Sequence, residues 1–230
     1  MEVRVIGGGL AGSEASYQLL KRGYNVKLYE MRKVKQTPCH NTTNLCELVC
    51  SNSLKSTELS TASGTLKEEL KRLDCLLLRC AEKAKVPSGG ALAVNREQFS
   101  LLVEEELNKF ENFERIDAEY IEIDRGVPTI IASGPLTSDK LAENIAKLIG
   151  NSDNLHFYDA VAPIVSGDSL DYDKLFFTTR YDKGEPSDYL NCGMNKDEYT
   201  AFYEQLVGGQ VANLHSFEKG EIFESCMPIE

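Results

Sequence analysis

The chain lacks the features that mark a membrane-spanning, secreted or nucleic-acid-binding protein. It contains no apolar run of the roughly eighteen residues that a membrane-spanning helix requires. Its N-terminus lacks the charged and apolar segments of a signal peptide. Positive charge is scarce, because 25 Lys and Arg stand against 36 Asp and Glu, for a formal net charge of −11. This balance argues against a free-standing nucleic-acid binder, although it is compatible with a local basic groove.

The cysteine pattern predicts reduced thiols. An odd number of cysteines without a secretion signal is typical of a cytoplasmic protein, and we expect that location here. The 230 residues suffice for one large domain or two small ones, and no internal repeat or low-complexity tract stands out. The seven cysteines are Cys39, Cys46, Cys50, Cys75, Cys80, Cys192 and Cys226.

The most informative segment is at the start of the chain. Residues 3–6 read as an apolar strand, residues 7–12 as a Gly-x-Gly-x-x-Gly turn, and residues 26–29 as a second apolar strand after a helix. Glu30 closes that second strand, close to the spacing of about twenty residues at which an acid binds a ribose. A lone glycine motif is weak evidence, but this order of strand, turn, helix and acid predicts a dinucleotide site rather than a ligand-free turn.

Each residue of the motif has an expected role. Gly7 allows the tight turn, Gly9 lets a pyrophosphate approach the backbone, and Gly12 lets the helix pack on the sheet. The start of the helix offers N–H groups to the phosphates, and the Glu30 carboxylate can accept hydrogen bonds from ribose hydroxyls. The predicted cofactor-binding residues are Gly7, Gly8, Gly9, Leu10, Ala11, Gly12, Glu30, Met31 and Arg32.

Periodicity predicts an α/β protein beyond this unit. Residues 33–64 read as a long loop. Helices are expected at 66–84, at 97–110 with Asn95 as its cap, at 137–149, and at 196–207 with Asn195 and Glu198 as a capping box. Strands are expected at 116–123, 129–134 and 157–165, the second of them buried. We place a domain boundary near Gly134, which divides the chain into residues 1–134 and 135–230.

The chain resembles the folate-dependent, flavin-linked tRNA uracil-5-methyltransferases of bacteria, which are related to the glucose-inhibited division proteins. The resemblance covers nearly the whole chain and corresponds to the N-terminal half of that family. The segments around Cys50 and Cys226 are its most specific parts. The matching segments are VIGGGLAGSEA (5–15), YEMR (29–32), ELVCSNSLK (47–55), ALAVNR (91–96), SGPLTS (133–138), YLNC (189–192) and FESCMPIE (223–230).

This resemblance implies a Rossmann-like FAD-binding domain of the two-dinucleotide-fold type, with a smaller inserted α+β domain. It implies transfer of a carbon from 5,10-methylenetetrahydrofolate to C5 of the T-loop uridine in tRNA, with FAD and either NADH or NADPH. Uracil C5 is a poor nucleophile until a thiolate adds at C6, so the chemistry needs a reactive cysteine. By resemblance, Cys226 is that nucleophile, and Cys50 is a second catalytic thiol.

Other interpretations stay open on the residues alone. Cys39, His40, Cys46 and Cys50 could form a zinc site, but adjacent ligands at residues 39 and 40 are poor geometry, and no metal is expected. The fingerprint alone also permits a nicotinamide-dependent dehydrogenase. The related flavoprotein that modifies the wobble uridine of tRNA shares the fingerprint. A truncated chain could be a non-catalytic module that binds RNA or a protein partner.

Overall fold

The computed structural model describes residues 1–49, 51–150, 165–179 and 184–210. The chain opens with the predicted β-α-β unit, made of strand β1 (Glu2–Ile6), helix α1 (Leu10–Leu20) and strand β2 (Asn25–Tyr29). The two strands are parallel, with Val5 opposite Leu28 in the register. Both of these side chains are fully buried, which is typical of the central strands of a parallel sheet.

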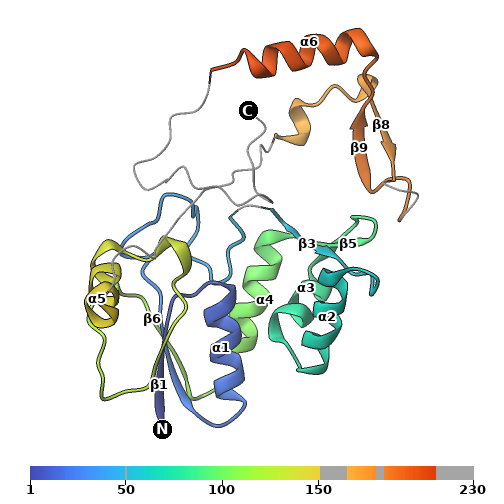
Figure 1. Ribbon diagram of the computed structural model, residues 1–230. Helices are drawn as coiled ribbons and strands as arrows, with labels where there is room; N and C mark the ends of the chain where they lie inside the picture. The colour runs from blue at the N-terminus through green and yellow to red at the C-terminus, as the bar shows by residue number, and fades with distance from the viewer. Residues whose placement is uncertain (50, 151–164, 180–183, 211–230) are drawn as a thin grey trace.

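The main sheet has four parallel strands in the order β6-β2-β1-β7. Strand β6 spans Phe113–Ile116 and β7 spans Thr129–Ile131. Figure 1 shows helix α1 on one side of β1 and helix α5 (Asp139–Ile149) on the other. Because parallel strands end at the same edge, residues 7, 30 and 132 gather at one end of the sheet. The predicted α/β fold class is confirmed.

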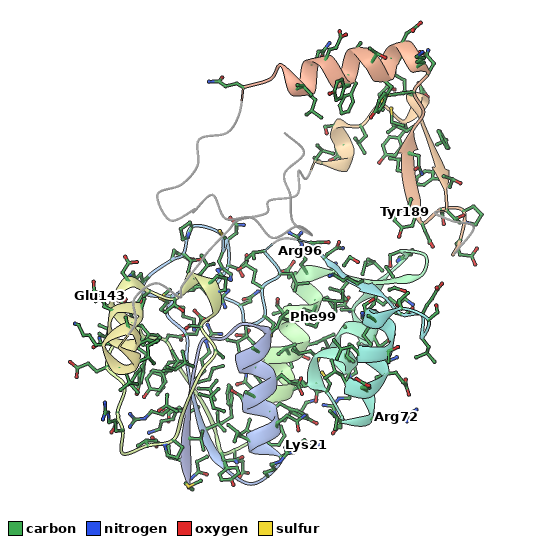
Figure 2. The ribbon with its side chains drawn as sticks, in the orientation of Figure 1. Lys21, Arg72, Arg96, Phe99, Glu143 and Tyr189 are labelled. Atoms are coloured by element: carbon green, nitrogen blue, oxygen red, sulfur yellow. The ribbon has the colours of Figure 1, made fainter. Side chains whose placement is uncertain are left out.

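A hydrophobic core joins α1 to two further helices, α3 (Leu76–Lys83) and α4 (Arg96–Asn108). The side chain of Phe99 on α4 is fully buried (Figure 2), and Asn95 caps α4 by accepting a hydrogen bond from the backbone N–H of Gln98 at 3.0 Å. The predicted helix and its cap are confirmed. Other fully buried residues of this core are Leu45, Leu76, Cys80, Leu92, Val94, Val103 and Leu107.

The expected single helix over residues 66–84 is wrong, because the structure has two helices there. Helix α2 (Ala62–Arg72) ends before Asp74, which adopts the left-handed backbone conformation with φ of 56°, and α3 starts two residues later. The change of direction leaves Leu66 and Leu73 more than half exposed, although the pattern placed them on the buried face. Tyr17 donates a hydrogen bond to the Asp74 carboxylate at 3.2 Å, so contacts from α1 fix the break.

A small antiparallel sheet packs beside these helices and was not predicted. It has the order β3-β5-β4, with β3 at Ser53–Ser56, β4 at Lys85–Val86 and β5 at Ala91–Val94. Residues 33–49, 51 and 52 form no helix or strand, and Cys50 lies outside the described residues. The predicted long loop is therefore confirmed up to β3, where strand pairing with β5 ends it.

Two strand predictions need correction. The strand expected at 116–123 lies earlier, because β6 pairs with β2 at Phe113–Ile116 and the chain after Ala118 has no strand until β7. Strand β7 was expected to be buried, but it is the last strand of the sheet among the described residues. Ile130 and Ile131 are accordingly 38% and 40% exposed.

The chain beyond Gly134 forms α5, a hairpin and a further helix. Gly150 ends α5 in the left-handed conformation, with φ of 74°. The hairpin pairs β8 (Leu175–Thr178) with β9 (Tyr189–Cys192), and α6 (Lys196–Val207) starts with the predicted capping box of Asn195 and Glu198. Short 3-10 turns lie at Gly134–Leu136, Gly167–Ser169 and Tyr172–Lys174. The strand expected at 157–165 falls outside the described residues except for its last residue.

The hairpin contacts the rest of the described chain at the turn between β4 and β5. The Tyr189 hydroxyl donates to the Ser88 carbonyl at 2.7 Å, and the Asp188 carboxylate accepts from the Gly89 backbone N–H at 2.7 Å. Across the described residues, no helix combines the length and apolarity needed to cross a membrane.

Candidate functional site

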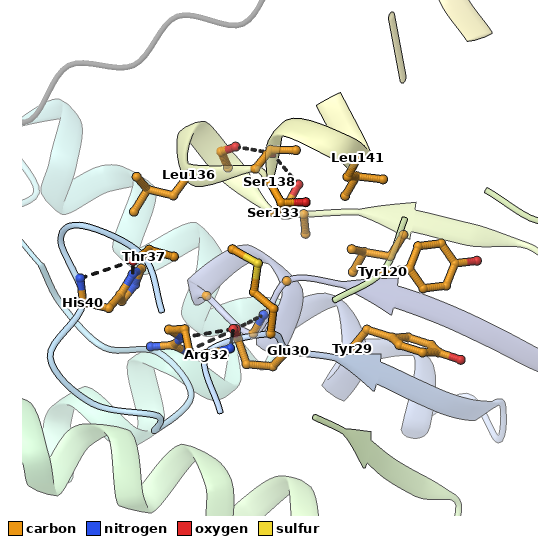
Figure 3. A pocket seen from close by; sticks show the side chains of 18 of the residues that line it. Tyr29, Glu30, Arg32, Thr37, His40, Tyr120, Ser133, Leu136, Ser138 and Leu141 are labelled. Carbon is orange, nitrogen blue, oxygen red and sulfur yellow. Dashed lines mark hydrogen bonds and ion pairs between the residues drawn. The ribbon is translucent and has the colours of Figure 1, made fainter. Parts of the chain in front are cut away.

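A cavity of about 360 Å³ opens where β1, β2 and β7 end. Its floor is the glycine-rich turn, and residues of the 30–49 loop form one wall (Figure 3). The opposite wall comes from the segment that follows β7, including Ser133, Leu136 and Leu141. The cavity lies at the carboxyl edge of a parallel sheet, which is where ligands bind in open α/β folds. All the predicted cofactor-binding residues line it except Gly12, which packs beneath the turn.

Gly7 and Gly12 are required by the packing of the protein itself. Gly7 has φ of 101°, and a Cβ atom there would lie 2.6 Å from the Ala132 carbonyl oxygen. A Cβ atom on Gly12 would lie 1.9 Å from the Gly7 carbonyl oxygen, so only glycine lets α1 approach the turn this closely. These are the tight-turn and helix-packing roles that the sequence predicts.

Gly9 differs from these two, because no atom of the described residues explains its lack of a side chain. A Cβ atom at Gly9 would meet no described atom within 4 Å, and its φ of −76° is one that any residue adopts. Gly9 is also the N-cap of α1, and no described side chain caps this helix end. A cavity-facing helix start of this kind offers backbone N–H groups to an anion, so the turn fits a diphosphate.

Gly8 makes room for the loop that contains Leu45 and Cys46, which packs against the turn. A Cβ atom at Gly8 would lie 2.5 Å from the Leu45 side chain and 2.8 Å from Oε2 of Glu30. The Gly8 carbonyl accepts a hydrogen bond from the Cys46 backbone N–H at 2.8 Å. The second glycine of the run therefore allows a protein loop, as well as an acid, to pack against the turn.

Glu30 is buried at the end of β2, with 7% of its surface exposed. Its Oε2 accepts from the Gly8 backbone N–H at 2.9 Å and from Nη2 of Arg32 at 3.2 Å. Its Oε1 accepts from the Arg32 backbone N–H at 3.0 Å and lies 3.1 Å from Nε of Arg32. Burial raises the pKa of Glu30, but hydrogen bonding to Arg32 and its charge outweigh burial, and the pKa is lowered overall. The carboxylate is therefore held ionised beside the cavity.

Arg32 connects Glu30 to a second acid that sequence reasoning did not single out. The Arg32 side chain is 2% exposed, and its Nη1 donates to Oε2 of Glu47 at 3.2 Å. Two carboxylates thus share one buried guanidinium, so the arginine charge is paired while the cluster keeps one net negative charge. A sequence signal for this pairing was absent, because Glu47 lies in a loop without periodicity.

The three buried cysteines, Cys46, Cys75 and Cys80, are not activated thiols. Burial raises the pKa of Cys46 to about 12 and that of Cys80 to about 11. Cys75, also buried, has a pKa raised by burial to about 11. Cys75 and Cys80 are small residues buried in the protein interior. Cys39, Cys46, Cys75, Cys80 and Cys192 are reduced thiols, whereas Cys50 and Cys226, the two predicted catalytic residues, lie outside the described residues.

The Cys and His side chains of the loop point to different partners. The Cys46 thiol donates to the Gly9 carbonyl at 3.6 Å, and Nδ1 of His40 lies 2.6 Å from the Thr37 hydroxyl. Within the described part of the chain, no three His, Cys, Asp or Glu side chains are arranged to hold a metal ion. Burial and the nearby charge of Arg32 lower the pKa of His40, so its ring is neutral at pH 7.

Several cavity residues were missed from the sequence. Thr37, His40 and Val49 come from the long loop, and Tyr29 stacks edge-on against Tyr120 with ring centroids 4.7 Å apart. Tyr120 lies after β6, in the segment wrongly expected to be a strand. Alternation of apolar residues, which is the signal for a strand, gives no information about which residues of a coil line a cavity.

The sequence profile of the glucose inhibited division protein A family matches residues 2–230. The chain belongs to this family. Curated members that it resembles are named methylenetetrahydrofolate–tRNA-(uracil-5-)-methyltransferase. The protein from Lactobacillus johnsonii is 54% identical over 228 residues, which is 99% of this chain and 52% of that protein. The protein from Natranaerobius thermophilus is 52% identical over 230 residues, which is 100% of this chain and 53% of that protein.

The chain therefore spans about half the length of these family members. Among solved structures, a family member from Aquifex aeolicus gives a TM-score of 0.44 at 14% identity, covering 56% of this chain and 23% of that one. That likeness is too low to support an argument. The sequence match over residues 2–230 decides membership.

Proposed function

We propose that this chain provides the FAD-binding part of a methylenetetrahydrofolate-dependent tRNA (uracil-5-)-methyltransferase. The observation that carries the proposal is the Gly9 turn. It faces a cavity, its Cβ direction is empty of described atoms, and it lies beside an ionised acid at the end of β2. Curated relatives with 52% to 54% identity over essentially the whole chain carry that enzyme's name, which supports the substrate and the reaction.

The residues fit the adenosine diphosphate half of FAD. The start of α1 would receive the diphosphate, with Gly9, Leu10 and Ala11 presenting backbone rather than bulky groups. Glu30 would take the ribose hydroxyls, and Met31 and Arg32 would line the adenosine side of the site. Because Arg32 occupies both oxygens of Glu30, ribose binding requires hydroxyls to share or replace those contacts. FAD supplies redox chemistry, with NADH or NADPH as reductant.

The reaction also needs a nucleophile for uracil. We propose Cys226 for this role and Cys50 as the second thiol, on the resemblance of their segments. Addition of the Cys226 sulfur to C6 makes C5 nucleophilic toward the one-carbon unit from methylenetetrahydrofolate. The C5 proton is then lost to a base, and the carrier amine leaves the transferred carbon. Because that carbon arrives at the methylene level, it also needs a hydride equivalent, which reduced FAD would supply, before the sulfur leaves C6 and the ring is restored as 5-methyluracil. The thiol and the one-carbon donor must both reach the uracil ring, so the T-loop uridine must turn out of its base stack.

The same proposal assigns the two parts of the chain. Residues 1–134 would form the first segment of the FAD-binding domain, and residues 135–230 most of a smaller domain on the substrate side. Support comes from the separate β8–β9 hairpin, which contacts the first part through Ser88 and Gly89. Since tRNA is the substrate, we place the reaction in the cytoplasm.

The direct test is methyl transfer from labelled methylenetetrahydrofolate to an unmodified tRNA transcript, with FAD and NADH or NADPH present. The chain should give 5-methyluridine in the T loop, and Cys226→Ala should give none. Cys192→Ala is the matched control, because Cys192 is an exposed free thiol, and it should retain activity. Product from Cys226→Ala equal to that of the unmodified chain would remove Cys226 from its role. Absence of product from the chain itself would refute the assigned activity.

A further inference from the structure

The loop between β2 and β3 is held closed over the glycine turn by a small set of contacts. Leu45 is fully buried against Gly8, and the Cys46 backbone N–H donates to the Gly8 carbonyl at 2.8 Å. The loop has no helix or strand of its own over residues 33–49. Its position therefore depends on side chains that reach its backbone.

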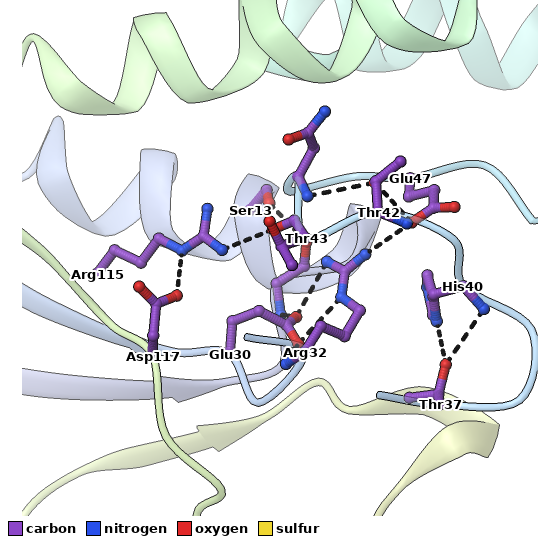
Figure 4. Close-up of polar contacts among 12 residues, drawn as sticks. Ser13, Glu30, Arg32, Thr37, His40, Thr42, Thr43, Glu47, Arg115 and Asp117 are labelled. Carbon is purple, nitrogen blue, oxygen red and sulfur yellow. Dashed lines mark hydrogen bonds and ion pairs between the residues drawn. The ribbon is translucent and has the colours of Figure 1, made fainter. Parts of the chain in front are cut away.

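Glu47 contacts the loop backbone at two successive residues (Figure 4). Its Oε1 accepts from the Asn41 backbone N–H at 2.8 Å, and its Oε2 accepts from the backbone N–H and the hydroxyl of Thr42 at 3.0 and 2.8 Å. The same Oε2 lies 3.2 Å from Nη1 of Arg32. One carboxylate thus folds the loop on itself and ties it to the arginine that holds Glu30.

Other contacts position the loop but do not reach the cofactor acid. Arg115 donates to the Thr43 carbonyl at 2.6 Å, and Ser100 donates to the Cys46 carbonyl at 3.4 Å. These anchor the middle of the loop to β6 and α4. The connection from the loop to Glu30 runs through Arg32 and Glu47, and each of these three side chains is at most 12% exposed.

We infer that Glu47 is a positioning residue that couples closure of the 37–49 loop to dinucleotide binding through Arg32 and Glu30. When the loop is closed, Thr37, His40 and Val49 form one wall of the cavity. When it opens, that wall is lost and Arg32 loses one of its two carboxylate partners. A ligand that binds the closed form must favour closure by the same factor by which closure favours the ligand. The inference rests on the proposed FAD site.

Cys46 provides a probe of this loop, and Cys80 provides an internal reference. Both thiols are fully buried, but Cys46 lies in the loop and Cys80 lies on α3 in the core. Opening the loop alone exposes Cys46, whereas unfolding of the core exposes both. Alkylation with N-ethylmaleimide at one fixed pH, followed by peptide mass spectrometry, measures the two rates in the same molecule.

The comparison uses the chain, its Glu47→Gln variant and a Glu69→Gln control. Glu47→Gln keeps the shape of the side chain but removes the charge that holds Arg32, while Glu69 is an exposed acid on α2. Without ligand, Glu47→Gln should speed labelling of Cys46 at least tenfold and leave Cys80 unchanged. Saturating FAD should slow Cys46 labelling in the chain at least tenfold. Glu69→Gln should match the chain in every respect.

Three results would overturn the inference. An unchanged Cys46 rate in Glu47→Gln would show that Glu47 does not hold the loop. Equal acceleration of Cys46 and Cys80 would show general destabilisation. Bound FAD without any effect on Cys46 would show that loop and ligand are independent. If the chain binds no FAD, the cofactor proposal fails by itself, and the rates without ligand still decide whether Glu47 closes the loop.

Discussion

Gly9 and Gly12 lie three residues apart in one turn, and their substitution by alanine should have opposite consequences. At Gly12, the new Cβ would lie 1.9 Å from the Gly7 carbonyl oxygen and 3.4 Å from a Val5 methyl group. Backbone must therefore move by more than about 1 Å, and overpacking of this kind destabilises a protein by about 1–3 kcal/mol. For a chain of this length, that corresponds to a melting temperature lower by roughly 2–12 °C.

At Gly9, the new Cβ enters space that no described atom fills, and the backbone already has an extended conformation that alanine adopts. Reduced freedom of the unfolded chain stabilises by about 0.4–1 kcal/mol, and loss of a glycine N-cap opposes this by a similar amount. The melting temperature should stay within about 3 °C of the original. The methyl group would, however, occupy the space where a diphosphate approaches the turn, and FAD affinity should fall at least tenfold.

Differential scanning fluorimetry with and without FAD, together with a flavin fluorescence titration, measures both effects. Gly9→Ala should keep its stability and lose most of its FAD-induced stabilisation. Gly12→Ala should lose stability before any ligand is added. The reasoning would be refuted if Gly9→Ala bound FAD as tightly as the original chain, because the open space at Gly9 would then have no ligand to explain it.

Three further predictions concern stability. Glu14 accepts hydrogen bonds from the backbone N–H groups of Leu76 and Leu77 at 3.3 and 3.1 Å, and so caps the start of α3. Glu14→Gln should therefore lower the free energy of unfolding by about 0.5–2 kcal/mol, measured by chemical denaturation. An unchanged denaturation midpoint would contradict this capping role. Phe99→Ala should cost about 3–5 kcal/mol by the same measurement, because the ring is fully buried; a loss under about 1 kcal/mol would show that the core repacks. The pKa values of Glu30 and Glu47 are lowered in the folded chain. The two carboxylates therefore stabilise the fold above pH 4.5, the pKa of the unfolded chain, and this stabilisation is lost as the pH falls through their lowered pKa values. The melting temperature should therefore fall steeply below about pH 4.5, and less steeply in Glu47→Gln. An equal dependence of melting temperature on pH in both proteins would show that Glu47 does not contribute to the acid sensitivity.

The sequence predicts the β-α-β unit well because each of its parts is a local signal. Gly7 has a φ of 101° and Gly12 packs on the Gly7 carbonyl, so both needs for glycine arise within the turn, and Glu30 follows a strand with clear apolar character. Caps are equally local, so Asn95 and Asn195 could be identified before the structure. These features depend largely on residues close by in the sequence, and a sequence motif includes those residues.

The misses arise where distant contacts decide the structure. The break at Asp74 interrupts a continuous helical pattern because Tyr17 on α1 binds its carboxylate. Strand β6 is placed by pairing with β2 rather than by its own alternation. Glu47 carries no motif, and its importance appears only when Arg32 is seen between two carboxylates. Cavity residues from the long loop are unpredictable for the same reason.

The account depends on an adenine dinucleotide whose diphosphate lies at Gly9 and whose ribose lies at Glu30. Displacement of FAD from the chain by fragments of the cofactor tests this most directly, with flavin fluorescence as the signal. ADP-ribose, which contains the adenosine diphosphate half, should displace FAD, and FMN, which lacks the adenosine, should not. Displacement by FMN as effective as that by ADP-ribose, or a failure of FAD to bind at all, would contradict the account.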